Sequence, residues 1–176
     1  MSVAAPRRIL VIGISGAGKS TFSRRLAERT GLPLIHLDQE FWQPGWVETP
    51  RAAWRAKVAG LAAREAWIMD GNYDATLDLS LPRADAVVWF DTPAPRALAR
   101  VARRVATSYG RVRPDLAPGC PEQIDWGFVR YVWNFNGRQR PRIAEALAAY
   151  AGRLDPIMIR SDAEAARVLA AFPIPS

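Results

Sequence analysis

The sequence predicts an α/β fold of three layers, with a five-stranded parallel sheet between two layers of helices. Three observations carry this prediction. Short apolar runs alternate with longer amphipathic segments, which is typical of parallel strands joined by crossover helices. A glycine-rich motif stands between the first apolar run and the first amphipathic segment. Three runs end at an aspartate, where ligands of such sheets bind: Asp38, Asp70 and Asp91.

The expected strands are short and apolar, and they cover residues 8–12, 34–37, 67–69, 86–90 and 157–159. The expected helices cover residues 19–30, about 50–64, 93–109, roughly 122–136, 139–151 and 163–171. Gly31 should end the first helix as a left-handed cap. Thr49 and Pro50 should begin the second as N-cap and first helical residue. Asn136 and Gly137 should separate the two helices after residue 122.

Residues 13–21 match G-x-x-x-x-G-K-[ST], the P-loop pattern that binds phosphate groups. Glycines let the loop adopt positive φ angles and approach an anion closely, while the free N–H groups of the next helix point at it. Lys19 should reach the β- and γ-phosphates, and the Ser20 hydroxyl is placed for Mg²⁺. We therefore expect ATP and Mg²⁺ as cofactors, bound by Gly13, Ser15, Gly16, Ala17, Gly18, Lys19, Ser20 and Thr21.

Length and composition favour one globular domain over residues 1–176. No apolar run approaches the ~20 residues of a membrane span, and residues 1–8 lack the apolar core of a secretory signal. We therefore expect a cytoplasmic protein. The single cysteine, Cys120, and the single histidine, His36, exclude an internal disulfide and a zinc site built from such ligands.

The net charge of +7 is carried almost entirely by arginine, since Lys19 and Lys57 are the only lysines. Arginine is richest at residues 96–113 and again at 138–142. An anionic small molecule and a nucleic acid would both suit this charge, although a nucleic-acid site needs arginines gathered on one face. A high content of alanine and arginine throughout the chain explains the charge equally well. Charge alone therefore leaves the class of ligand open.

Several unusual motifs give the chain a likeness to the adenylate-kinase-like branch of P-loop kinases. More narrowly, it resembles the bacterial topology modulation proteins of the FlaR type. The motifs that carry the resemblance are His36–Asp38, Trp42–Trp46, Trp67–Tyr73, Gly110–Asp115, Gly119–Glu122, and Trp133–Phe135 followed by Arg140–Pro141. The resemblance implies the strand order 2-3-1-4-5, with Asp70 on a strand beside the P-loop strand. Asp70 then resembles the Walker-B aspartate, which holds Mg²⁺ through water, so the expected metal residues are Ser20 and Asp70.

The same resemblance implies a lid over about residues 104–142 and an acceptor-binding region over about residues 38–65. By this likeness Arg100 lies near the donor adenine and Arg104 near the phosphates. A further lid arginine would return from the later segment, as Arg138, Arg140 or Arg142. The loop at 110–121 is expected to be the mobile part. Adenylate kinases carry Phe-Pro-Arg after Asp-Gly, whereas Asn-Tyr-Asp follows here, which weakens the case for AMP as acceptor.

Asp38 has alternative roles at the sequence level. It would be a general base if the acceptor is a hydroxyl, and it would orient the substrate or a Mg²⁺-bound water if the acceptor is a phosphate. A plain loop carboxylate is the third reading. His36 is expected to be structural. The aromatic residues nearby form either a stacking wall for a base or sugar or a cap on the core: Phe41, Trp42, Trp46 and Tyr73.

The function that the sequence favours is an ATP-dependent phosphotransferase acting on a small molecule, preferably a nucleotide or nucleoside. Phosphoryl transfer depends mainly on positioning and charge neutralisation, and the expected catalytic residues are Lys19, Asp38, Arg104, Arg138 and Arg142. The alternative is an ATP-binding, nucleic-acid-associated regulator of DNA topology with no dedicated acceptor. The family name and the charge favour it, and the lack of a helix-turn-helix or RNP-type motif counts against it. The sequence leaves monomer and dimer open.

Overall fold

The computed structural model describes residues 5–174. Five strands form one parallel sheet in the order β2-β5-β1-β6-β7. Their bounds are β1 Arg8–Gly13, β2 Leu34–His36, β5 Trp67–Asp70, β6 Ala86–Phe90 and β7 Ile157–Ile159. Numbered within this sheet alone, the order is 2-3-1-4-5, so the predicted fold is confirmed. Residues 1–4, part of the start segment used in the sequence analysis, lie outside the described residues.

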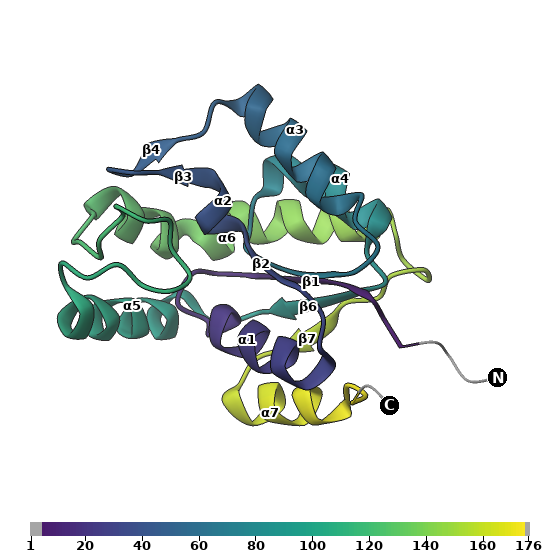
Figure 1. Ribbon diagram of the computed structural model, residues 1–176. Coiled ribbons are helices and arrows are strands. Elements are labelled where there is room, and N and C mark those ends of the chain that lie inside the picture. The colour runs from purple at the N-terminus through teal and green to yellow at the C-terminus, as the bar shows by residue number, and fades with distance from the viewer. Residues whose placement is uncertain (1–4, 175–176) are drawn as a thin grey trace.

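Helices cover both faces of the sheet and give the molecule three layers (Figure 1). The helices are α1 Lys19–Thr30, α2 Leu37–Phe41, α3 Arg51–Ala62, α4 Leu77–Ser80, α5 Ala94–Ser108, α6 Trp126–Ala148 and α7 Asp162–Ala171. In Figure 1, α1 and α7 lie together on one side of the sheet, and α3, α4 and α6 lie on the other. Helix α5 packs against α6. Within residues 5–174, no helix is both long enough and apolar enough to span a bilayer.

Strand β1 is the centre of the core because it pairs with β5 on one side and β6 on the other. A strand covered on both faces needs a continuous apolar run rather than alternation. Every β1 residue after Arg8 is buried, as are all four residues of β5. Strand β7 at the edge is only partly buried. The apolar runs seen in the sequence therefore match the burial that each strand receives.

The register of the sheet determines which strand ends become neighbours. His36 of β2 is the partner of Asp70 in β5, and Val11 of β1 is the partner of Asp70 on its other side. Gly13, the last residue of β1, pairs with Phe90 of β6. The ends of four strands and the start of the glycine-rich loop thus meet at one edge of the sheet, where ligands of open α/β sheets bind.

One prediction about the helices is wrong. The two helices expected at 122–136 and 139–151 form a single helix, α6, which begins at Trp126 and passes through Gly137. The apolar residues on both sides of Gly137 are buried in the core: Val132, Phe135, Ile143 and Leu147. A glycine costs a helix only about 1 kcal/mol, and burial of these side chains outweighs that cost.

Smaller differences occur between β2 and α5. Strand β2 ends at His36 rather than residue 37, because Leu37 already begins α2. Helix α3 begins at Arg51, and the Thr49 hydroxyl donates to the carbonyl of Phe41 instead of capping the helix. A short hairpin follows α2, with strands β3 Trp42–Gln43 and β4 Val47–Glu48. The segment after Asp70 contains short helical turns rather than a plain loop. None of these short elements has enough residues for a periodic pattern to show in sequence.

The continuity of α6 can be tested by replacing Gly137 with alanine. Gly137 is exposed, and a Cβ there would meet no atom within 4 Å. Alanine should therefore raise the free energy of unfolding by about 0.5–1 kcal/mol, measured by urea denaturation. Gly110→Ala is the matched control, since a Cβ there also meets nothing but φ is +73°; it should lower stability by about 1–2 kcal/mol. A loss of stability in Gly137→Ala would contradict a continuous helix.

Candidate functional site

The glycine-rich loop turns sharply between β1 and α1. Gly16 and Gly18 have φ angles of +86° and +100°, a region that side chains with a Cβ rarely adopt. A Cβ on Gly16 would lie 2.5 Å from the carbonyl oxygen of Ala97, so this glycine lets the loop pack against α5. A Cβ on Gly18 would have only Arg100 Nη1 nearby, at 3.8 Å. The loop thus packs tightly against α5 at Gly16, whereas a Cβ at Gly18 would have only the Arg100 side chain nearby.

Lys19 begins α1, and its ammonium folds back over the loop. Its Nζ atom donates to the carbonyl oxygen of Ile14 at 3.0 Å, and the residue is only 9% exposed. Burial lowers the pKa of Lys19, while the nearby carboxylates of Asp70 and Asp38 act in the opposite direction. Lys19 therefore lies in the field of two strand-end carboxylates, which places the P-loop lysine and these acids in one site.

Asp70 is held by the histidine beside it. His36 Nδ1 donates to Asp70 Oδ2 at 2.8 Å, and the two residues are 9% and 4% exposed. The other oxygen, Asp70 Oδ1, is buried and has no hydrogen-bond partner within residues 5–174. Buried carboxylate oxygens are normally satisfied. An unpaired carboxylate oxygen close to a P-loop lysine is suited to bind a water molecule or a cation that accompanies a bound ligand.

Asp38, at the start of α2, is held by Tyr73. The Tyr73 hydroxyl donates to Asp38 Oδ1 at 2.6 Å. Burial raises the pKa of Asp38 above its usual value, and the hydrogen bond from Tyr73 opposes part of that rise. Burial and the Asp38 charge raise the pKa of the Tyr73 phenol, so it stays protonated and remains a donor. One Asp38 oxygen is thereby engaged in a fixed direction.

Two arginines within the predicted lid, Arg104 and Arg113, pair with carboxylates of the same segment. Arg104 Nη2 lies 3.0 Å from Glu122 Oε1, and Arg113 Nε lies 2.7 Å from Glu122 Oε2. Arg113 Nη1 also donates to Asp115 Oδ2 at 2.9 Å. Glu122 and Asp115 are buried. Arg104 lowers and Asp115 raises the pKa of Lys19, so this charged cluster lies near the P-loop lysine.

Hydrogen bonds join residues 39–46 to residues 114–121, which belong to the loop at 109–125. We call this set of contacts the clasp. The backbone N–H of Gly45 donates to the carbonyl of Gly119 at 2.9 Å. Trp46 Nε1 donates to the carbonyl of Pro121 at 3.1 Å, and the Cys120 thiol donates to the carbonyl of Gln43 at 3.2 Å. Cys120 is fully buried. Figure 1 shows the hairpin and this loop at the same end of the molecule as α5.

The aromatic residues near Asp38 pack mainly on one another. The Phe41 ring lies 4.9 Å from the ring of Trp42, 5.1 Å from that of Trp54 and 4.9 Å from that of Tyr73, between centroids. Trp54 is buried and Phe41 is half-buried. The Tyr73 ring packs on Phe41 and Trp54, and its hydroxyl points to Asp38. Of the two sequence-level readings, this packing favours a cap on the core that also supports the site.

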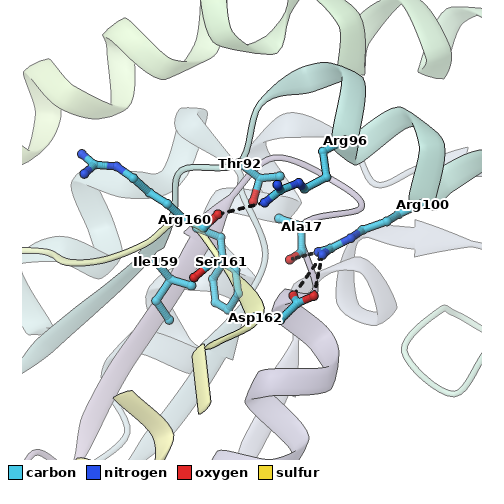
Figure 2. A pocket seen from close by; sticks show the side chains of 9 residues that line it. Ala17, Thr92, Arg96, Arg100, Ile159, Arg160, Ser161 and Asp162 are labelled. Carbon is cyan, nitrogen blue, oxygen red and sulfur yellow. Dashed lines mark hydrogen bonds and ion pairs between the residues drawn. The ribbon is translucent and has the colours of Figure 1, made fainter. Parts of the chain in front are cut away.

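A shallow pocket opens beside the P-loop on the side away from Asp38. Arg100 crosses it, donating from Nη1 to the Ala17 carbonyl at 3.0 Å and from Nη2 to the Asp162 carboxylate at 2.9 Å (Figure 2). Arg96 Nη1 donates to the carbonyl of Arg160 at 3.3 Å. The pocket is lined by Ala17, Phe90, Thr92, Arg96, Arg100, Ile159, Arg160, Ser161 and Asp162. The end of β7 and the start of α7 therefore border the loop.

The arginines expected to return from the later segment are not gathered at the P-loop. Arg138 is exposed on α6. Arg142 Nη1 lies 3.5 Å from Asp74 Oδ2 and is largely exposed. Arg140 binds both oxygens of Asp91, at 2.8 and 3.0 Å, and this pairing lowers the pKa of Asp91. Asp91, the third strand-end acid, thus ties β6 to α6.

The residues present fit a bound MgATP. The first N–H groups of α1 have no partner within the helix, as at every helix start, and the glycine loop aims them at one place. Ser20 is half-buried next to Lys19, Thr21 is exposed and Ser15 is half-buried. No group of three or more His, Cys, Asp or Glu side chains able to hold a metal occurs within residues 5–174. A metal here would rest on phosphate oxygens, Ser20 and a water held by Asp70.

Comparison with known proteins identifies the fold. No protein-family model matches the chain, and no curated protein matches its sequence. Shikimate kinase from Acinetobacter baumannii, in complex with shikimate, is 21% identical with a TM-score of 0.57, over 93% of this chain and 88% of its own. A gluconokinase from Sinorhizobium meliloti 1021 is 20% identical with a TM-score of 0.52, over 96% and 94%. A sugar kinase from Janibacter sp. HTCC2649 is 19% identical with a TM-score of 0.51, over 93% and 92%. The chain therefore has the P-loop kinase fold.

Sequence reasoning missed several partners of the predicted residues. The sequence offers Tyr73 either a place in a stacking wall or a place in a cap on the core, and neither alternative includes its hydrogen bond to Asp38. Glu122 and Asp115 were given no role, although they pair with the lid arginines. The strand order 2-3-1-4-5 places the ends of β2 and β5 side by side, and this was the signal that could have paired His36 with Asp70.

The clasp can be tested through the only cysteine of the chain. Gly119 has φ +79°, and a Cβ there would lie 2.9 Å from Pro44 Cβ. Gly119→Ala should loosen the clasp and speed modification of Cys120 by a thiol reagent by about tenfold or more, since backbone strain of this kind costs about 1–2 kcal/mol. Gly152→Ala is the control, because its φ is also +79° but nothing lies within 4 Å. Equal acceleration in both variants would show that Cys120 is reached only by global unfolding.

Proposed function

We propose that the protein is an ATP-dependent phosphotransferase that moves the γ-phosphoryl group of MgATP to a hydroxyl of a small molecule. The observation that carries the proposal is the single cluster formed by the P-loop lysine, Lys19, and two strand-end carboxylates, Asp70 and Asp38. A phosphate-binding loop next to a carboxylate with a raised pKa is what such a transfer needs. The shared fold with shikimate kinase and gluconokinase supports it.

On the donor side, Lys19 and the loop N–H groups would bind the triphosphate, and Ser20 with Asp70 would hold Mg²⁺. The metal neutralises charge on the phosphates when it is bound. The donor base would lie toward the pocket crossed by Arg100, which borders the loop, and it would need the Arg100 side chain to move away from Ala17 and Asp162. Arg104 would be the arginine that reaches the phosphates, and its electrostatic influence on Lys19 supports this role.

On the acceptor side, Asp38 would accept the proton of the attacking hydroxyl. Its Oδ1 is engaged by Tyr73, which leaves the other oxygen as the proton acceptor. The arginines closest to Asp38 and Lys19 already pair with carboxylates: Arg113 with Asp115 and Glu122, and Arg104 with Glu122. If Arg104 turns to the donor phosphates, a phosphate on the acceptor would need Arg113, which acts on Asp38 and is engaged by Asp115 and Glu122. This pairing favours a nucleoside or a sugar-like hydroxyl compound over a nucleotide.

We also propose that the chain is a topology modulation protein of the FlaR type and forms a single domain, with residues 109–125 as its lid. Most of the motifs behind that resemblance surround the site. His36–Asp38 and Trp67–Tyr73 carry the paired acids, and Trp42–Trp46 and Gly119–Glu122 form the clasp and the lid cluster. Residues 126–142 of the predicted lid belong to α6, which packs in the core.

Lys19→Ala should lower the rate of phosphoryl transfer by at least about 100-fold, because it removes the cation aimed at the transferred group. The measurement is ADP release from MgATP with a panel of nucleosides, sugars and nucleotides. Lys57→Ala is the matched control, since Lys57 is the only other lysine and pairs with Glu40 at 2.6 Å on the surface.

Transfer that survives in Lys19→Ala would contradict the P-loop chemistry. Turnover that ignores every acceptor in the panel, together with tight binding of duplex DNA at physiological salt, would instead support the nucleic-acid-associated alternative. Circular dichroism and a urea midpoint close to those of the unchanged protein would show that the variants are folded.

The role of Asp38 predicts a pH dependence. A base must be deprotonated, so the rate should rise with pH through the pKa of Asp38, which burial raises above its ordinary value. Tyr73→Phe removes the hydrogen bond that stabilises the carboxylate and should move this rise to higher pH. Asp38→Asn should lower the rate by about 10²–10⁴ and abolish the rise. An unchanged pH profile in Tyr73→Phe would contradict the assignment of Asp38 as base.

A further inference from the structure

We propose that His36, the only histidine of the chain, is a positioning residue for the metal site: its Nδ1–H fixes the Asp70 carboxylate so that Oδ1 faces the Mg²⁺ of bound MgATP. This inference rests on the proposed function, because it needs the P-loop to bind MgATP. It assigns a role to a residue that the sequence pattern indicates only as structural.

The hydrogen bond itself is set by the sheet. His36 and Asp70 are register partners at the ends of the adjacent parallel strands β2 and β5. Nδ1 is the donor because the carboxylate oxygen can only accept, and the distance of 2.8 Å is that of a strong bond. Both side chains are buried, so water does not compete for this contact. The pair is thus rigid and holds one Asp70 rotamer.

The second carboxylate oxygen of Asp70, Oδ1, indicates the role of this Asp70 rotamer. Asp70 Oδ1 is buried without a partner within residues 5–174, although Asp70 is 4% exposed. A pair that only stabilised the core would be expected to satisfy both oxygens, because an unpaired buried acceptor is costly. Asp70 is also the carboxylate that acts most strongly on Lys19. The unpaired oxygen therefore belongs to the side of the carboxylate that serves the P-loop.

The chemistry of such support is well defined. A partner that holds a metal-binding carboxylate or its water fixes orientation and raises affinity, and its removal typically costs about 10–100-fold in metal affinity or activity. His36 holds Asp70 through one nitrogen only. A side chain that donates from the Nδ1 position should replace it, and one that donates from farther out should not.

The experiment measures binding of a non-hydrolysable ATP analogue by calorimetry, once with Mg²⁺ and once with EDTA. It compares the unchanged protein with His36→Asn, whose amide nitrogen lies close to the Nδ1 position, and with His36→Gln, whose amide lies farther out. In His36→Gln, the ratio of the analogue affinity with Mg²⁺ to that with EDTA should be about tenfold smaller than in the unchanged protein. The affinity with EDTA should stay unchanged. His36→Asn should retain most of the Mg²⁺ effect.

A second readout uses the fact that one histidine gives one set of imidazole signals. With ¹⁵N-labelled histidine, Mn²⁺ added with the analogue should broaden the His36 signals, and Mn²⁺ added to Asp70→Asn should broaden them less. Equal losses in His36→Asn and His36→Gln, a matching fall in metal-free affinity, or unbroadened signals would each overturn the inference. If the unchanged protein binds the analogue equally with Mg²⁺ and EDTA, the metal site of the proposed function fails as well, which distinguishes the two failures.

Discussion

The site depends on the burial of one charge, the ammonium of Lys19. An ion taken out of water costs several kcal/mol unless opposite charges and hydrogen bonds replace its hydration. The protein supplies them from separate parts of the chain: a loop carbonyl from Ile14, Asp38 from α2, Asp70 from β5, and Asp115 from the lid loop. Because the carboxylates must lie close enough to offset the cost of this buried charge, the position of Lys19 constrains the ends of β2 and β5 and the path of the loop at 109–125.

The same constraint explains why Arg104 and Arg113 are each paired with acids. Arg104 lies near the buried Lys19 cation and Arg113 lies near Arg104, and like charges repel. Glu122 accepts both guanidinium groups and Asp115 accepts one of them, so the cluster is close to neutral. An incoming triphosphate would meet donors that are already oriented, at the expense of the bonds to Glu122.

The strands and the cap at Gly31 were predictable because they follow from short apolar runs and from local backbone rules, whereas the sheet order and the place of Asp70 beside the P-loop strand were implied by the resemblance to adenylate-kinase-like proteins. Sequence reasoning failed where a contact depends on the register of two strands, as for His36 and Asp70, or on the path of a loop without periodicity, as for Glu122. It also failed at Gly137, where burial of Phe135 and Ile143 overrides a local glycine signal. Apart from the helix at Gly137, the information that only the folded chain contains is which side chains pair with one another.

The clasp has a consequence for the order of events in a reaction cycle. Residues 39–46 and 114–121 are joined by hydrogen bonds from the backbone N–H of Gly45 to the carbonyl of Gly119 and from the Trp46 indole to the carbonyl of Pro121. Neither segment can move away alone without breaking these bonds. If the protein transfers a phosphoryl group as proposed, an acceptor would enter and a spent donor would leave through one shared opening, and the frequency of its opening would limit turnover.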